Sequence, residues 1–139
     1  MKKILIILPT LNETKYIEKL FLLLKKVNLK LSFLFIDHGS TDGTLNKIKK
    51  IKKTYPKKVF LIEKKTREGI GKAHKDGLNW AYKRNYSLAV TMDTDLAHHP
   101  KYIKKLIHKS NTFDLVVGSR YLKNKSMVNW SLFRVFLSN

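Results

Sequence analysis

The stretch Leu88-Ala89-Val90-Thr91-Met92-Asp93-Thr94-Asp95 joins a largely apolar run to two carboxylates one residue apart. The run indicates a strand covered on both faces, as in a parallel sheet. Open α/β sheets bind ligands outside the carboxyl ends of their strands, which is where Asp93 and Asp95 would lie. Carboxylates at that edge suit a hard cation such as Mg²⁺ held against phosphate oxygens. Taken alone, the pair is equally typical of a polar turn in which an aspartate caps a helix.

The same order of apolar run, polar loop and amphipathic helix recurs on both sides of this stretch. Strands are expected at residues 4–8, 33–36, 59–62, 88–92 and 115–117, with single helices between them. This alternation predicts the α/β class, a Rossmann-like three-layer sandwich with a mostly parallel central sheet. The length, and the absence of a linker or repeat, favour a single domain over residues 1–139.

Polar residues follow four of the predicted strands. The carboxyl ends of parallel strands lie at one edge of a sheet, so the residues of these loops are expected to line a single crevice there. These residues are Asn12-Glu13, Asp37-His38, Asp93-Thr94-Asp95 and Arg120. In the third helix, expected at about residues 69–83, the spacing of Ala73, Gly77 and Ala81 predicts close packing against the sheet.

The net charge of +19 comes from 29 Lys and Arg against 10 Asp and Glu. No helix-turn-helix, zinc-finger or RNA-binding sheet signature accompanies it, so no nucleic-acid partner is expected. An anionic membrane surface or an anionic substrate explains the charge equally well. The chain has no cysteine, which excludes disulfides and thiolate metal sites. No apolar stretch approaches the roughly 18 to 20 residues that a membrane-spanning helix needs.

Two common nucleotide-binding motifs are absent from the sequence. Gly69-Ile70-Gly71-Lys72-Ala73-His74 lacks the third glycine of a dinucleotide fingerprint, and it follows a third strand instead of a first. The same segment lacks the upstream glycine and the Ser or Thr of a P-loop. His98-His99 has no third ligand at helical spacing, so a structural or lipid-phosphate-facing role is favoured over zinc binding.

Taken together, the loops resemble family 2 glycosyltransferases with a GT-A fold, and within them the dolichyl- or polyprenyl-phosphate mannosyltransferases. The motifs agree in order and spacing over essentially the whole chain. They are Leu8-Pro9-Thr10-Leu11-Asn12-Glu13, Ile36-Asp37-His38-Gly39-Ser40-Thr41-Asp42-Gly43-Thr44, Gly69-Ile70-Gly71-Lys72-Ala73, Met92-Asp93-Thr94-Asp95-Leu96-Ala97-His98-His99-Pro100 and Val117-Gly118-Ser119-Arg120-Tyr121.

The resemblance implies two groups of substrate-binding residues. One group would line the base and ribose of a sugar nucleotide: Pro9, Leu11, Glu13, Ile36, Asp37 and His38. The other would meet the diphosphate or the acceptor phosphate: Asp93, Thr94, Asp95, Arg120 and Arg134.

Within the second group, the resemblance implies that Asp95, with Asp93, holds Mg²⁺ or Mn²⁺, and that Asp93, Asp95 and Arg120 form the catalytic set. A diphosphate leaving group needs its charge neutralised as the glycosidic bond breaks. Purely structural interpretations remain open for three of the residues: Asp37 as the cap of a turn, Glu13 as a helix cap, and Arg120 as a surface charge.

The implied activity is metal-dependent, inverting transfer of a hexose, in the first place mannose from GDP-mannose, to a polyprenyl or dolichyl phosphate. The expected location is peripheral, at the inner face of the cytoplasmic membrane. Two alternatives stay open: a family 2 enzyme that uses a UDP-sugar for surface polysaccharide or glycolipid, and a non-catalytic fragment that binds nucleotide or membrane.

The sequence departs from the family pattern at several positions. His38 stands where a second acidic residue is usual, Leu11 replaces an aromatic residue, and Thr94 replaces alanine. Family members also continue well beyond Asn139, so a second chain that supplies the missing C-terminal part is a further expected partner. The apolar segment 127–137 is expected to pack on the sheet or to rest on lipid or a partner.

Overall fold

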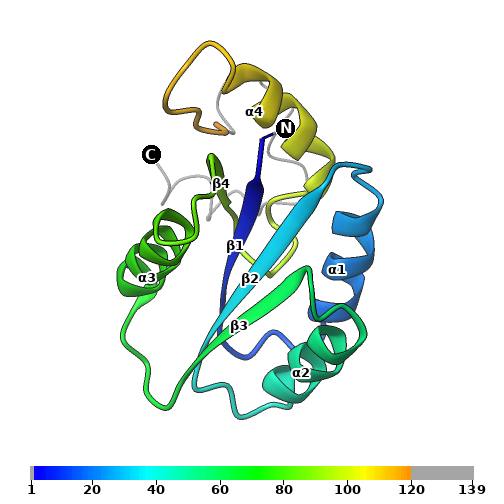
Figure 1. Cartoon of the computed structure of the whole chain (residues 1–139). Coiled ribbons are helices and arrows are strands. Elements are labelled where there is room, and N and C mark those ends of the chain that lie inside the picture. Colours follow the sequence, from blue (N-terminus) through cyan, green and yellow to red (C-terminus); the bar gives the residue numbers. More distant parts are fainter. Residues whose placement is uncertain (1, 120–139) are drawn as a thin grey trace, which may run out of the picture. The chain divides into compact units, whose positions relative to one another are not determined.

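The computed structural model describes residues 2–119, in which strands and helices alternate (Figure 1). In chain order the elements are β1 (Ile4–Thr10), α1 (Ile17–Lys25), β2 (Leu31–His38), α2 (Thr44–Thr54), β3 (Val59–Lys64), α3 (Ile70–Tyr82), β4 (Leu88–Thr91), the 3₁₀ helix η1 (Pro100–Tyr102) and α4 (Ile103–Lys109). The chain divides into two units, residues 1–103, which contain the sheet, and residues 104–139. Within the described range no helix is long and apolar enough to cross a membrane.

The strands described in the first unit form one parallel sheet in the order β3-β2-β1-β4. β1 is central, and all seven of its residues are buried. It pairs with β2 from Ile4↔Leu31 to Thr10↔Asp37 and with β4 from Ile4↔Leu88 to Ile7↔Thr91. The predicted α/β class with a parallel central sheet is therefore confirmed.

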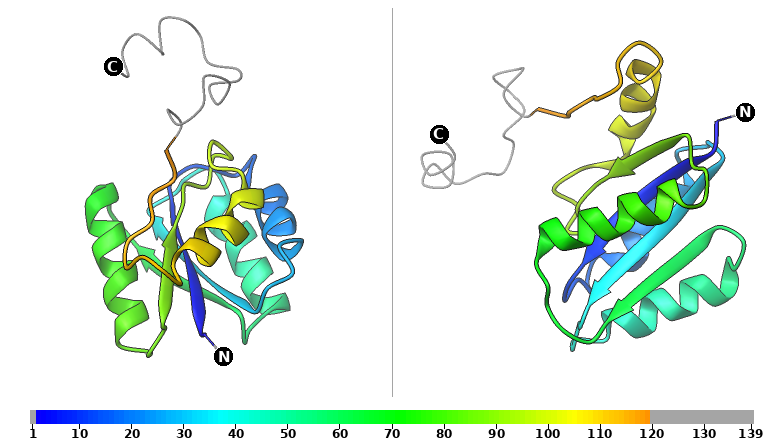
Figure 2. Two further views of the ribbon diagram at one scale, coloured as in Figure 1. Left: turned by 90° about the horizontal axis from the view of Figure 1, so that it is seen from above. Right: turned by 60° about the vertical axis from the view of Figure 1, so that its left-hand side comes forward.

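The helices of the first unit cover both faces of the sheet. Figures 1 and 2 show α1 and α2 on one face and α3 on the other. α1 buries the four residues at i, i+3, i+4 and i+7, namely Ile17, Leu20, Phe21 and Leu24. This apolar stripe accounts for the helix, since most helical stability in proteins comes from packing an amphipathic face.

The winding of the chain reverses between β1 and β4. From β1 the chain moves outward through β2 to β3, and it then returns to place β4 on the opposite side of β1. In an open α/β sheet such a reversal leaves a crevice outside the carboxyl ends of the two strands. The loops that follow β1 and β4 therefore lie beside each other.

α3 packs unusually close to the sheet through its small residues. Ala73 and Ala81 are 2% and 4% exposed, and Gly77 is buried between them. A Cβ atom built on Gly77 would lie 2.5 Å from Ile7 Cγ2 and 3.0 Å from Ile36 Cδ1. The predicted close packing of the Ala73, Gly77 and Ala81 stripe is confirmed.

The predicted fifth strand at residues 115–117 is wrong for the described part of the chain. No strand is present from 110 to 119, and Leu115 and Val117 are 82% and 73% exposed. Because these side chains bury little apolar surface, nothing offsets the conformational entropy of ordering them as a strand. Arg120, Arg134 and the apolar segment 127–137 lie outside the described residues.

Candidate functional site

The loop that carries the two carboxylates is tied directly to the end of β1. Thr94, which is 3% exposed, donates a hydrogen bond from Oγ1 to the Pro9 carbonyl oxygen at 3.2 Å. Met92 continues the pairing, since its N–H donates to the Ile7 carbonyl at 3.1 Å. Asp93 and Asp95 are thereby held next to the β1–α1 loop, as the reversal of winding requires.

The β1–α1 loop is in turn fastened to the β2–α2 loop. Asn12 donates from its N–H to Ser40 Oγ at 2.9 Å and accepts from the Thr41 N–H at 2.9 Å. Glu13 N–H donates to Thr44 Oγ1 at 2.8 Å. Asn12 has a φ of 55°, in the left-handed region that asparagine tolerates better than most residues. These hydrogen bonds therefore join two loops that are far apart in the sequence at one edge of the sheet.

Asp42 stabilises the same pair of loops. Its carboxylate accepts from the N–H of Thr14 at 3.0 Å and from the N–H of Thr44 at 3.0 Å. Burial raises the pKa of Asp42, but hydrogen bonds from the Thr44 hydroxyl and from these backbone amides outweigh it, so the pKa lies below its ordinary value.

A cavity of about 290 Å³ opens at this edge of the sheet. It brings together seven of the residues that the resemblance pointed to, from the ends of three strands: Pro9, Leu11, Glu13, His38, Asp93, Thr94 and Asp95. The lining also includes residues that are not among the predicted site residues: Thr10, Arg67, Gly69, Ile70 and Ala73. Arg67 adds a cation to the cavity, and its only sequence signal is its position just before the Gly69 motif.

Ile36 and Asp37 do not line this cavity. Ile36 lies in the core beneath α3, and both are fully buried. Asp37 Oδ1 accepts from the N–H of Gly39 at 3.2 Å and of Ser40 at 3.0 Å, while Oδ2 accepts from Ser40 Oγ at 2.6 Å. The Asp37 carboxylate therefore shapes the β2–α2 loop, and its contact with a nucleotide stays a prediction.

The histidines after the carboxylates have structural contacts. His99 Nδ1 accepts from the Lys101 N–H at 3.1 Å and caps the 3₁₀ helix that begins at Pro100. His98 Nδ1 lies 3.5 Å from both the amide nitrogen and Oδ2 of Asp93. These contacts agree with the preference for a structural role over a zinc site.

Carboxylates crowd the cavity. The pKa of Glu13 lies above its ordinary value of 4.5, first because burial disfavours the charged form and then because Asp95, Asp42 and Asp93 repel its charge. Such a concentration of negative charge favours a cation. Asp95 uses Oδ1 to accept the Ala97 N–H at 2.8 Å, which orients the carboxylate.

The donor set fits a divalent metal that completes its coordination with other oxygens. Within residues 2–119 no group of three or more His, Cys, Asp or Glu side chains is placed to hold a metal ion. Mg²⁺ and Mn²⁺ are commonly held by one or two carboxylates together with substrate phosphates and water. Asp93 and Asp95 match this arrangement in number and in ligand type.

Glu13→Gln is expected to raise the free energy of unfolding at pH 7 when metal is chelated, because it removes a repelled charge. A raised folded-state pKa makes the ionised side chain destabilising above that pKa, and the penalty disappears below the unfolded value of 4.5. The stabilisation should therefore vanish as the pH falls to 4 and below. Urea unfolding at pH 7 and pH 4 measures it.

Glu18→Gln is the matched control for this substitution. Glu18 pairs with Lys47 at 3.0 Å on the surface, so the same chemical change there should leave stability unchanged or slightly lower. Equal stabilisation by both substitutions would contradict a charge conflict at Glu13.

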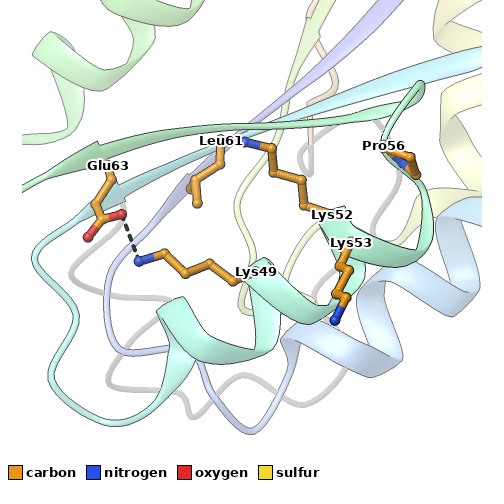
Figure 3. Close-up of a pocket in the computed structure, with 6 residues that line it drawn as sticks. All are labelled: Lys49, Lys52, Lys53, Pro56, Leu61 and Glu63. Atoms are coloured by element: carbon orange, nitrogen blue, oxygen red, sulfur yellow. Dashed lines mark ion pairs between the residues drawn. The ribbon is translucent and has the colours of Figure 1, made fainter.

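A second hollow, of about 390 Å³, lies between α2 and the edge strand β3 (Figure 3). Figure 3 shows Lys49 reaching from α2 to Glu63, with which it forms an ion pair at 2.9 Å. The remaining lining residues are Lys52, Lys53, Pro56 and Leu61. The one carboxylate here is already paired with a lysine, and none of the predicted site residues lines the hollow. The cavity between the β1 and β4 loops is therefore the candidate site.

Comparisons of the sequence with known proteins give a family and named relatives. Residues 5–137 match the family model described as Glycosyl transferase family 2. The chain is 32% identical over 141 aligned residues to the polyprenol monophosphomannose synthase of Mycolicibacterium smegmatis, covering 99% of this chain and 52% of that protein. It is also 32% identical over 136 residues to the undecaprenyl-phosphate mannosyltransferase of Micrococcus luteus, covering 98% of this chain and 56% of that protein. The chain thus spans about half the length of these curated relatives.

Solved structures show the same fold. The mannosyltransferase PcManGT from Pyrobaculum calidifontis, solved in complex with GDP-Man and Mn²⁺, superposes with a TM-score of 0.56 at 28% identity, covering 67% of this chain and 27% of that one. TarS 1–349 of S. aureus, in complex with UDP, superposes with a TM-score of 0.64 at 20% identity, covering 87% of this chain and 40% of that one. The expected GT-A-like architecture is confirmed by these neighbours.

Proposed function

The chain belongs to glycosyl transferase family 2. On that premise we propose that it is the donor-binding domain of a metal-dependent, inverting hexosyltransferase. The proposed donor is GDP-mannose and the proposed acceptor is a polyprenyl or dolichyl phosphate. The observation that carries the proposal is the cavity in which Pro9, Leu11 and Glu13 from the β1 loop meet Asp93 and Asp95 from the β4 loop. The names of the curated relatives and of the GDP-Man complex support the choice of mannose.

The cavity wall offers different chemistry at its two sides. Pro9, Leu11 and His38 present apolar and aromatic surface suited to a base and ribose. Asp93 and Asp95, with the Thr94 hydrogen bond fixing the loop between them, would hold Mg²⁺ or Mn²⁺ against the diphosphate. When bound, the metal would supply charge neutralisation for the nucleoside diphosphate that leaves.

The remaining assigned residues complete the proposal. Ile36 and Asp37 would act by positioning the β2 end and its loop beside the base. Arg120 and Arg134 are proposed to meet phosphate of the donor or the acceptor. Because a lipid phosphate already attacks as an anion, the site needs no dedicated general base to remove a proton from it.

The partners and location are part of the same proposal. The net charge of +19 favours association with the anionic inner face of the cytoplasmic membrane, where a polyprenyl-phosphate acceptor would be available.

A panel of donors tests the function by calorimetry of the whole chain with and without Mn²⁺. GDP-mannose is expected to bind in a metal-dependent way and more tightly than UDP-sugars, and its turnover with polyprenyl phosphate would establish transfer. Tighter binding of a UDP-sugar would favour a polysaccharide or glycolipid enzyme. Donor binding without turnover would favour a non-catalytic fragment, and the absence of any nucleotide binding would overturn the proposal.

A further inference from the structure

Four side chains of alternating charge form a closed ring beside the β3–α3 loop. Lys64 ends β3, Glu68 lies in the loop that follows, and Lys72 and Asp76 lie on α3. Lys64 Nζ lies 3.1 Å from Asp76 Oδ2 and 3.5 Å from Glu68 Oε2. Lys72 Nζ lies 3.8 Å from Glu68 Oε2 and donates a hydrogen bond to Asp76 Oδ1. Each lysine therefore bridges the same two carboxylates, and none of the four residues lines the candidate cavity.

The ring differs from an isolated pair on the surface. Its four side chains are between 17% and 44% exposed, and that of Asp76 is the least exposed. The hydrogen bond from Lys72 holds the pKa of Asp76 below its ordinary value against the effect of burial, and Lys64 adds to this. Contact with Asp76 raises the pKa of Lys64. Both shifts keep the ring charged at neutral pH, and a network of charges stabilises more than one exposed pair does.

Asp76 stands on a part of α3 that is fixed to the sheet. The next residue, Gly77, packs so closely that a Cβ atom built on it would lie 2.5 Å from Ile7 Cγ2. Glu68, by contrast, belongs to a loop, residues 65–69, in which every residue is exposed. Because the helix is held by the core and the loop is not, the ring fastens the loop to the helix.

The backbone of the loop is also held against the end of β2. The Glu68 N–H donates to His38 Nδ1 at 3.3 Å. The Lys65 carbonyl oxygen lies close to Gly39, since a Cβ atom built on Gly39 would be 3.0 Å from it. These contacts fix two points of the loop backbone, and the ring adds the attachment of the Glu68 side chain to α3.

Arg67 lies between these two points of attachment and lines the candidate cavity. Among the described residues that line the cavity it is the only lysine or arginine. No ion pair within residues 2–119 involves Arg67, so the place of its guanidinium depends on the path of the loop backbone. Affinity at the cavity is therefore expected to depend on how much of the time the loop holds this path.

We propose that Asp76 is a positioning residue: through Lys64 and Lys72 it holds Glu68, and with it the loop that places Arg67 in the candidate cavity. The proposal rests on the proposed nucleotide site and adds a residue outside the lining that controls it. Without the carboxylate of Asp76 the two lysines lose their common attachment to α3, and the loop leaves its place more often. The apparent affinity then falls with the fraction of molecules in which the loop is in place.

Asp76→Asn tests the proposal by two measurements on the whole chain. Hydrogen exchange of the ligand-free chain, followed by NMR, is expected to be about fivefold or more faster at the Glu68 amide, because local opening of the loop becomes easier. Calorimetry in Mn²⁺ is expected to show GDP binding about fivefold more weakly, the order of effect typical of residues that act through a coupled network. Unchanged exchange at Glu68 would overturn the inference, and so would unchanged affinity in a chain that binds GDP.

Two further variants separate positioning from simple stabilisation of α3. Asp76→Glu keeps the carboxylate and should retain both the slow exchange and the affinity. In a chain that already carries Arg67→Ala, Asp76→Asn should cost no further affinity, because its effect passes through Arg67. Equal losses with and without Arg67 would overturn the inference. A lower free energy of unfolding with unchanged GDP affinity, the result expected of a purely structural ring, would also overturn it.

Glu18→Gln is the matched control for the change of charge. Glu18 pairs with Lys47 at 3.0 Å and does not line the cavity, so its substitution should leave Glu68 exchange and GDP affinity unchanged. Effects as large as those of Asp76→Asn would show that overall charge is responsible and would overturn the inference. Failure of the unaltered chain to bind any nucleotide with Mn²⁺ would overturn the proposed function. Exchange at Glu68 would then decide alone whether Asp76 positions the loop.

Discussion

Asp95→Ala is expected to weaken Mn²⁺-dependent binding of GDP by about tenfold to a hundredfold. Asp95 is exposed at the edge of the cavity, and it is one of the two carboxylates proposed to hold the metal. Changes in groups that merely orient metal ligands already cost about that much affinity, and loss of a ligand should cost at least as much. Titration calorimetry of GDP in Mn²⁺ and in EDTA measures the effect, which should be present in the first buffer and absent in the second.

Glu63→Ala is the matched control for net charge. Glu63 pairs with Lys49 at 2.9 Å in the hollow between α2 and β3, away from the residues that line the candidate site. Its removal changes the charge of the chain by the same amount and should leave GDP affinity unchanged. An equal loss in both variants would show that Asp95 acts only through overall charge. A loss of the same size in EDTA would contradict a metal role.

Gly77→Val is expected to lower the free energy of unfolding by about 3 kcal/mol or more, at the upper end of the range for overpacked cores. A Cβ at this position already lies 2.5 Å from Ile7 Cγ2 and 3.2 Å from Ile7 Cδ1. Valine adds two further carbons where β1 and β2 leave no room, so α3 must move away from the sheet. Urea unfolding followed by circular dichroism measures the loss.

Gly71→Val provides a control in the same helix. Nothing lies within 4 Å of a Cβ built on Gly71, and valine is somewhat better than glycine as a helix former. Stability should therefore be unchanged or slightly higher. Similar losses at both glycines would mean that the helix backbone, and not the contact with Ile7 and Ile36, is responsible.

The strands and the parallel sheet were predictable because their signals are local. The continuous apolar runs that include Ile4–Leu8 and Phe33–Ile36 are typical of strands buried on both faces, and β1 and β2 contain them. The stripe of Ala73, Gly77 and Ala81 likewise predicted the face of α3 that contacts the sheet. The prediction of a strand at residues 115–117 was wrong because three apolar residues in a row do not indicate whether another element will bury them.

The candidate site was predictable in part. Loops after parallel strands must meet at one edge, so Glu13, Asp93 and Asp95 could be grouped before the structure was known. Arg67 and Ile70 could not, because their place in the lining depends on the path by which the β3–α3 loop brings Arg67 and the start of α3 back toward the strand ends. No periodicity in the sequence encodes that path.

By itself, then, the sequence determined the class of fold, the edge of the sheet that carries the site, and the carboxylates suited to a cation, because each follows from residue type and strand periodicity. Only the tertiary structure showed that the side chains of Asp37 and His38 differ in their hydrogen-bond partners. Both stand at the end of β2, but Asp37 satisfies its carboxylate with the amides of its own loop, whereas His38 has one ring nitrogen held by Glu68 and the other without a partner in the described chain. That difference depends on which donors and acceptors folding brings within reach, and no local pattern records it.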